Sequence, residues 1–318
     1  MQCLSPQAKQ AMARIFNLVN MSELPALSEN VHELLEMLGN KNATARHLSS
    51  IILKDISLTS KVLQVVNSAY YTRGTQVSSI SRAVTLIGFN TIRELALSIA
   101  LFENFTQAGG DKSMVGNILT KSYLGGSLAK DVSKNYKLRV SPEEAFICGL
   151  FHNLGELIVL IYLPDLFRQI EKKRCPDWDK HSAAREVLGD LTFYQVGMEV
   201  AMFWNLCEKI IFSMHPAPPD VRHPGDDLAL LMNLSAFCNQ FIEQVNEDGK
   251  QMDLLFQHYG RILRVNRDKK KIFRLLEHII DSAGNISEII RSGLRRMRLH
   301  SKLIVVARTG KDDYVRIS

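Results

Sequence analysis

One apolar stretch in the middle of the chain constrains the fold more than any other feature. Residues 148–160 read CGLFHNLGELIVL, the most apolar run of the sequence, and a His-Asn pair lies inside it. A helix start precedes the run, because Ser141 is followed by a proline at the first helical position and by a glutamate three residues after the cap. The sequence therefore predicts one helix from Pro142 to about Tyr162, buried on most sides.

The length of this helix, about 20 residues, also raises the question of a membrane span. Glu156 and the pair His152-Asn153 argue against a span, because charged and polar side chains are costly in hydrocarbon. The sequence contains no second run of this kind. We expect the central helix of a soluble all-α protein without membrane contact.

The composition indicates a globular protein, and the cysteine usage indicates its cellular compartment. The chain has 318 residues, of which 46% are hydrophobic and 23% charged, enough for two core-forming units or one large helical domain. Residues 1–20 lack an apolar core followed by a small-residue cleavage site, so we expect no secretory signal. Scattered cysteines, odd in number, favour free thiols in a reducing cytoplasm. They are Cys3, Cys148, Cys175, Cys207 and Cys238.

Positive charge is concentrated in the last quarter of the chain. Residues 250–318 contain 16 Lys and Arg against 7 Asp and Glu, whereas residues 1–249 carry a net charge of −3. Solvated helix faces are one interpretation, and a surface for an anionic partner is the other. The candidate residues for that surface are Arg261, Arg264, Lys269, Lys270, Lys271, Arg295, Arg296 and Arg298. No nucleic-acid motif accompanies them, so we expect at most weak, non-specific binding of nucleic acid.

Four motifs precede the apolar helix. They read LPAL at 24–27, ILKDISLT at 52–59, NSAYY at 67–71 and SISRAVTLIG at 79–88. In this order they resemble the HDOD (HD-related output) domain, with Ile56 where that domain usually has proline. The resemblance covers roughly residues 21–220. The positions that match its motifs include Asp55, Asn67, Ser68, Tyr70, Gly88 and Trp204.

The apolar helix itself resembles a motif of the wider HD superfamily of metal-dependent phosphohydrolases. Residues 149–155, GLFHNLG, are similar to its "GLLHDIG", with Asn153 in place of the aspartate. An aspartate offers two anionic oxygens to a metal pair, whereas an asparagine offers one neutral carbonyl and a donor group. A buried His152-Asn153 pair that hydrogen-bonds neighbouring helices is the interpretation we favour over metal binding.

Other metal-ligand positions implied by the resemblance are also changed. The first histidine, about 30 residues before the pair, falls on Lys121 or Ser122, and another falls on Thr192 or Phe193. Of a His-His pair near the end of the domain, His215 survives. We therefore expect no metal and no cofactor. The candidate remnant of the old pocket is the set His152, Asn153, Lys121 and His215.

Several smaller features predict local structure. Asp55 or Ser57 is expected to cap a helix from Leu58 to about Tyr70, and Gly88 is expected to end one helix so that the next packs back on it.

Asn67 and Ser68 follow a predicted helix and can bond backbone groups in the turn, with contact to a ligand as the alternative for Asn67. Trp204 is expected in the core. A helix is predicted from about Lys112 to Asn135, and the small pair Gly125-Gly126 within it permits close helix approach. For residues 301–318 a short hairpin is predicted.

The predicted architecture is all-α, an HD-like helical bundle behind an N-terminal helical subdomain, with an additional C-terminal helical segment. The expected boundaries are an N-terminal helix at 1–20, the HDOD domain at 21–220 and the basic segment at 221–318. Within the domain, the N-terminal half ends at about residue 108 and the HD-like half begins at about 111.

The resemblance implies a non-catalytic signal-transduction module of a bacterial cytoplasm. We expect it to act through contacts with a partner protein, with a small ligand in the degenerate HD pocket as an option. The sequence contains no P-loop, no G-x-S-x-G and no H-E-x-x-H. The alternatives are a residual phosphohydrolase for a nucleotide or cyclic dinucleotide, and nucleic-acid binding through the basic segment.

Overall fold

The computed structural model describes residues 12–13, 28–37, 40, 42–68, 71, 77–174, 180–215, 226–247, 249–265 and 269–309, with the backbone alone for 308–309. These residues form helices and turns, and no strand occurs among them, which confirms the all-α class. The helices are α2 (Glu29–Glu36), α3 (Ala45–Leu53), α4 (Ile56–Val66), α5 (Ile80–Ile87), α6 (Phe89–Gln107), α7 (Lys112–Asn135), α8 (Pro142–Phe151), α9 (Leu154–Tyr162), α10 (Pro164–Lys173), α11 (Lys180–Val187), α12 (Phe193–Phe203), α13 (Glu208–Phe212), α14 (Asp227–Asn246), α15 (Met252–Tyr259), α16 (Lys269–Ala283), α17 (Glu288–Met297) and α18 (Leu299–Thr309).

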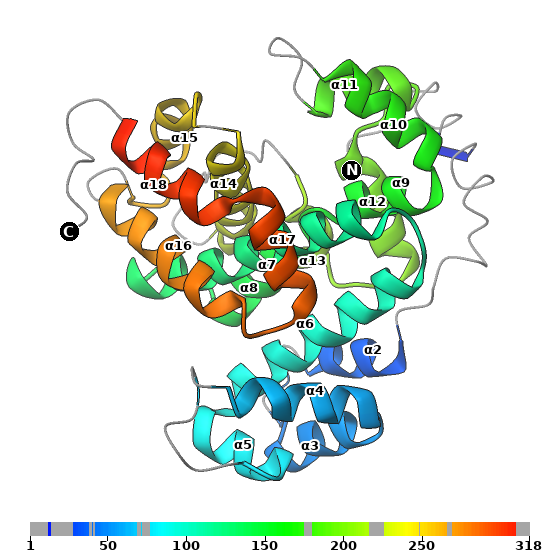
Figure 1. Cartoon of the computed structure of the whole chain (residues 1–318), viewed down its shortest axis with the longest axis vertical. Coiled ribbons are helices and arrows are strands. Elements are labelled where there is room, and N and C mark those ends of the chain that lie inside the picture. Colours follow the sequence, from blue (N-terminus) through cyan, green and yellow to red (C-terminus); the bar gives the residue numbers. More distant parts are fainter. Residues whose placement is uncertain are drawn as a thin grey trace.

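The helices are arranged around α7 and α8, which pack along each other in the middle of the molecule (Figure 1). Helices α2–α5 gather at one end of α6. Helices α9–α12 lie on one side of the central pair, and α14–α18 lie on the other. Helices α14, α16 and α17 pack directly against α7, so the C-terminal helices share the core of the HD-like half.

Short polar side chains begin three of the N-terminal helices. The side chains of Thr44, Asp55 and Ser79 each accept a hydrogen bond from the first turn of α3, α4 and α5, respectively. The cap predicted at Asp55 or Ser57 is therefore Asp55. Ser28 occupies the cap position of α2 but makes no capping bond through its side chain.

Asn67 clamps the chain after α4. Its Nδ2 donates to the carbonyls of Leu63 (3.0 Å) and Val77 (2.8 Å), and its Oδ1 accepts from the Val77 N–H (2.7 Å). The amide thus pairs with both backbone groups of a residue ten positions away and fixes the approach to α5. This confirms the structural role predicted for Asn67. Tyr70 lies outside the described residues.

Gly88 joins α5 to α6 in a conformation that favours glycine. Its φ is +95°, and it is both the C-cap of α5 and the N-cap of α6. The long helix α6 then packs against α2, α4, α5 and α7. The predicted turn at Gly88 is confirmed, and it places the N-terminal helices at the end of α6.

Glycines allow α7 and α8 to approach closely. A Cβ on Gly149 would lie 2.7 Å from the Cα of Gly126, and a Cβ on Gly126 would lie 2.5 Å from the carbonyl oxygen of Phe146. Both distances are too short for any side chain. The close packing predicted from the pair Gly125-Gly126 is therefore confirmed, and α7 runs over the predicted residues.

The continuous helix predicted from Pro142 to Tyr162 is wrong, because a turn at His152-Asn153 divides it into α8 and α9. The carbonyl of Gly149 accepts a hydrogen bond from the side chain of Asn239, and the N–H of His152 bonds this carbonyl three residues back (3.4 Å). A side chain that competes for a helix carbonyl in this way breaks the regular ladder. The pair thus lies between two helices and not inside one.

The apolar stretch is mostly buried inside the protein. Pro142–Tyr162 is long and apolar enough to cross a membrane, and 89% of its most apolar window is buried inside the protein. The core helix of a globular protein passes the same test of length and composition, so the stretch is weak evidence for a span. Trp204, predicted in the core, is buried and its ring lies 6.3 Å from that of Phe105.

The hairpin predicted for residues 301–318 is also wrong over its described part, because Leu299–Thr309 forms α18. Leu303, Val306 and Ala307 are buried, at a spacing that places them on one face of a helix. That face packs against α14 and α16. The apolar run was short, and only tertiary packing distinguishes a helix from a strand at this length. Residues 310–318 lie outside the described residues.

Candidate functional site

Asn153 lies at the junction of α7, α8–α9 and α14, where polar side chains gather. Its Nδ2 donates to Ser122 Oγ (3.2 Å) and to Asn239 Oδ1 (3.0 Å). Asn239 in turn donates through its own Nδ2 to the carbonyls of Gly149 (3.1 Å) and Ser235 (3.0 Å). Because both of these acceptors are carbonyls, the orientation of Asn239 is fixed and its oxygen faces Asn153.

This orientation explains why an amide stands at position 153. The oxygen of Asn239 needs a donor from its neighbour, and Asn153 supplies one from a side chain that is 8% exposed. An ionised aspartate would place a second acceptor against that oxygen and would leave Ser122 Oγ without its donor. The chain therefore uses Asn153 as a hydrogen-bond donor in a packed network.

His152 points to the other side of the same turn. Its Nδ1 lies 2.8 Å from the carbonyl of Ser213 and 3.3 Å from Ser235 Oγ. A carbonyl only accepts, so Nδ1 carries the proton. Burial lowers the pKa of His152 to about 3, and charges on Lys180, His181 and His215 lower it further. His152, whose side chain is half-buried, is therefore neutral at neutral pH.

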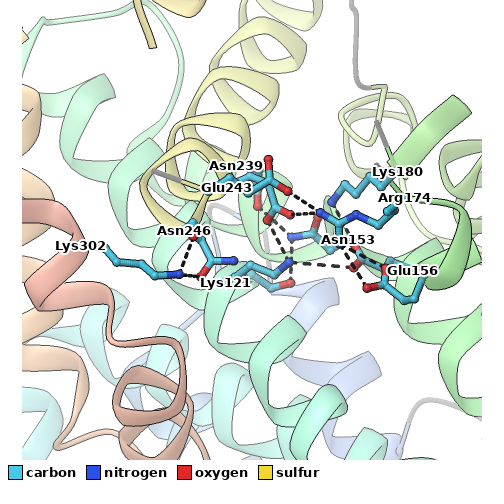
Figure 2. A network of polar contacts seen from close by, with 12 residues as sticks. Lys121, Asn153, Glu156, Arg174, Lys180, Asn239, Glu243, Asn246 and Lys302 are labelled. Atoms are coloured by element: carbon cyan, nitrogen blue, oxygen red, sulfur yellow. Dashed lines mark hydrogen bonds and ion pairs between the residues drawn. The ribbon is translucent and has the colours of Figure 1, made fainter. Parts of the chain in front are cut away.

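A row of charges crosses the junction beside Asn153 (Figure 2). Lys121 Nζ lies 2.9 Å from Glu243 Oε2 and 3.9 Å from Glu156 Oε1. Lys180 Nζ lies 2.9 Å from the other oxygen of Glu156, and an Arg174 nitrogen lies 3.7 Å from the other oxygen of Glu243. Arg174 also pairs with Glu171 and Glu247.

The inner three charges are almost completely buried. The side chains of Lys121, Glu156 and Glu243 are 11%, 7% and 14% exposed. Burial alone would lower the pKa of Lys121, but Glu243 and Glu156 hold it above its usual range. Burial would raise the pKa of both carboxyls, but Lys121 and Lys180 hold them below their usual range. All three groups are thus ionised at neutral pH.

Comparison with known proteins identifies the family of this chain. The model of the HDOD domain matches residues 24–217. The chain belongs to the HDOD domain family. A solved HDOD domain protein of unknown function from Geobacter sulfurreducens has a TM-score of 0.71 at 20% identity, with 87% of this chain and 98% of that chain covered.

Two further solved structures share the fold. One, from Marinobacter aquaeolei and provisionally named a signal transduction protein, has a TM-score of 0.65 at 19% identity and covers 88% of this chain and 65% of that chain. The other, from Shewanella amazonensis and provisionally named a phosphohydrolase, has a TM-score of 0.58 at 22% identity and covers 92% and 98%. At these identities the likeness shows the fold alone. The HDOD chain spans 42% of the length of two curated relatives that it matches, from Treponema pallidum and Bacillus subtilis.

The residues of this HDOD chain at the HD-like centre do not fit a divalent metal ion. Asn153 presents its donor to the network, and the Lys121 ammonium lies between the two carboxylates where it would repel a second cation. In the part of the chain that the structure describes, no three His, Cys, Asp or Glu side chains are grouped so as to hold a metal. Three or more such ligands are the usual requirement for a transition-metal site.

The remaining predicted metal positions have structural roles. Thr192 caps α12, where its hydroxyl accepts from the N–H of Gln195 in a capping box. Phe193 is buried, with its ring 6.3 Å from that of Phe167. The ring centroid of His215 lies 4.5 Å from that of Tyr194, with the rings tilted by 58°, and burial lowers the pKa of His215. Of the four predicted pocket residues, Lys121, His152 and Asn153 gather at the junction, and His215 is near enough for its charge to act on His152.

Sequence reasoning missed the contribution of α14. Ser235, Asn239 and Glu243 all belong to this helix, beyond the matched residues 24–217, and all three contact the centre. They recur every four residues in a mainly apolar helix, a spacing that places polar groups in one row on one face. That row was the available signal. Glu156 was recognised as polar, but its partners were not.

The predicted anion-binding cations are divided over three places in the C-terminal helices. Arg261 and Arg264 follow α15, the three lysines begin α16, and the other arginines lie on or just after α17. Some are held by local contacts, since Lys269 donates to Asp253 (3.1 Å) and Arg296 donates to Asn117 (3.1 Å). Weak, salt-sensitive binding of nucleic acid stays a prediction.

Proposed function

We propose that this HDOD chain is a non-catalytic signal-transduction module of a bacterial cytoplasm that acts by binding a partner protein. The observation that carries the proposal is the Lys121 contact with Glu243. An ammonium bonded to a carboxylate occupies the centre of the bundle, so protein groups satisfy the polar atoms that a hydrolase would direct at a metal and substrate. Without this chemistry, the same fold can still serve as a surface that binds a partner protein.

Membership of the HDOD family also supports a regulatory role. The HDOD model covers the larger part of the chain, and a structural neighbour is provisionally named for signal transduction. Several large apolar side chains are exposed among the described residues. Ile56 is 86% exposed and Phe203 is 55% exposed, and apolar side chains of this size are common in protein–protein contacts. They mark two separate places where a partner can be sought.

A residual phosphohydrolase is the alternative, and one observation favours it. His152 of the HD pair is retained and neutral, and a neutral imidazole is the form that binds metal. One structural neighbour is provisionally named a phosphohydrolase. Turnover of a cyclic dinucleotide or a dNTP that disappears in a His152→Ala variant would select this alternative.

Affinity capture followed by reconstitution tests the proposed function. The immobilised full-length chain is expected to retain a defined protein from a lysate of its own organism, and the purified pair should form a stoichiometric complex by titration calorimetry. Ile56→Ser and Phe203→Ser serve as matched surface variants, because neither side chain is part of the core. Binding that is lost in one and kept in the other would locate the contact. Metal-dependent turnover without any stoichiometric protein complex would contradict the proposal.

A further inference from the structure

We propose that Glu156 and Glu243 form a cation site that the chain fills with its own Lys121 ammonium. The ammonium is thereby a resident cation, which joins α7, α9 and α14 at the place where the HD pair lies. The ligand class of the site is an organic ammonium. Nothing in the proposal depends on which partner the module binds.

The geometry of the contacts points to this assignment. Lys121 Nζ bonds Glu243 Oε2 at 2.9 Å and lies 3.9 Å from Glu156 Oε1, so one nitrogen serves two carboxylates. The two carboxylates are more than eighty residues apart in sequence, one on α9 and the other on α14. Without Lys121, the two buried carboxylates would lie near each other and would keep only the more exposed cations Lys180 and Arg174 as partners. Buried charges are costly unless they are fully paired.

The same carboxylates extend the contact on both sides into an alternating chain of charges. In order, the groups are Lys180, Glu156, Lys121, Glu243 and Arg174 (Figure 2). Each carboxylate uses one oxygen for the inner ammonium and the other for an outer cation. The inner lysine is the most buried of the three cations, at 11% exposure against 16% and 29%.

Both ends of this chain belong to the α10–α11 unit. Arg174 directly follows α10, and Lys180 is the first residue of α11. Among the described helices, α11 has its extensive contacts with α10 alone. The ion pairs with Glu156 and Glu243 therefore link this unit to the bundle, and Lys121 links those two carboxylates to each other.

The Lys121 amine is covalently attached to α7, so it can neutralise the two carboxylates without an ion from solution. A free ion occupies less than half of the sites when its concentration is below its dissociation constant, whereas a lysine on helix α7 is present at all times. The surrounding amides are compatible with this site, because Asn153 donates to the Asn239 side-chain oxygen and to the Ser122 hydroxyl. Asn239 donates to two backbone carbonyls, so both amides leave the carboxylates to the cations.

Charge-removal variants of the full-length chain provide the first test. Lys121→Met keeps the length of the side chain and removes its charge, and it should lower Tm by roughly 5–10 °C. Adding Glu243→Gln removes the carboxylate that was left alone and should recover about half of that loss. Lys209→Met, at a half-exposed ion pair with Glu144, is the control and should change Tm by less than about 2 °C. A double variant no more stable than Lys121→Met would overturn the proposal.

Chemical rescue provides the second test. In Lys121→Ala, ethylammonium chloride should raise Tm by about 3 °C more than sodium chloride at equal ionic strength, since the cation binds the folded state alone. The wild type and Lys209→Ala should respond equally to the two salts. Lys121→Ala/Glu243→Gln should lose the ethylammonium response. Equal responses of Lys121→Ala to both salts would overturn the assignment of a cation site.

Discussion

Replacement of Gly155 by alanine is expected to lower the free energy of unfolding by more than about 3 kcal/mol, the largest effect of a methyl group added at any of the described glycines. A Cβ on Gly155 would lie 1.7 Å from the carbonyl oxygen of Phe193 and 2.8 Å from the backbone nitrogen of Gly197. These atoms are backbone, so α9 and α12 would have to separate. Urea unfolding of the variant measures the loss.

A second glycine provides the matched control. Gly284 has open space around its Cβ position, and its φ lies outside the left-handed region. Gly284→Ala is expected to change the free energy of unfolding by less than about 0.5 kcal/mol. If Gly155→Ala were as stable as Gly284→Ala, the close crossing of α9 and α12 would be wrong, and with it the position of the turn that holds His152 and Asn153.

Acidification is expected to destabilise the protein through His152 before the carboxylates are protonated. Burial lowers the pKa of His152 to about 3, whereas an unfolded histidine titrates near 6.5. Between these values the unfolded chain binds a proton that the folded chain does not, so stability falls as pH falls. The loss from this one group is about 1.4 kcal/mol per pH unit.

A His152→Gln variant isolates that contribution. Glutamine can still donate to the carbonyl of Ser213 but does not titrate. The stability advantage of the wild type over the variant should shrink by about 3 kcal/mol from pH 6.5 to pH 4. His47→Gln, at an exposed histidine, controls for the substitution. Urea unfolding at intervals of one pH unit decides the question, and parallel curves for wild type and His152→Gln would show that His152 is solvated and titrates freely.

Glu156 and Glu243 contribute in a lower pH range. Nearby lysines hold both pKa values below the usual range, so the stability that these carboxylates supply is present above about pH 4.5 and is lost as pH falls through their folded pKa values. The contribution of Glu94 to stability changes with pH in the opposite direction, because burial raises the pKa of this carboxyl. The comparison with His152→Gln cancels all of these groups, since both proteins contain them.

Local signals predicted most of the helical framework. The N-cap at Asp55, the turn at Gly88 and the glycine pair of α7 were predicted because each depends on a residue with one dominant local conformation or contact. The errors arose where long-range contacts decide. At the turn inside residues 142–162, the Gly149 carbonyl accepts a hydrogen bond from the side chain of Asn239, which lies 90 positions away in sequence.

The candidate site was predicted in part for the same reason. Lys121, His152 and Asn153 were selected from a motif pattern, and the structure brings them to one junction. Glu243 and Asn239 could not be paired with them from local sequence, because the pairing depends on how α14 packs against α7 and α8. A row of polar residues at four-residue spacing marks a buried polar face, but it does not identify the face of the partner helix.

We expect a network of protein groups, and no metal ion, to hold the HD-like centre together. Elemental analysis of the purified full-length chain measures this, with His152→Ala as the matched variant. We expect well below about 0.1 equivalent of iron, manganese or zinc in both proteins, because Lys121 and the donor group of Asn153 oppose a metal cation at this centre. About one equivalent of metal in the wild type that disappears in His152→Ala would contradict it.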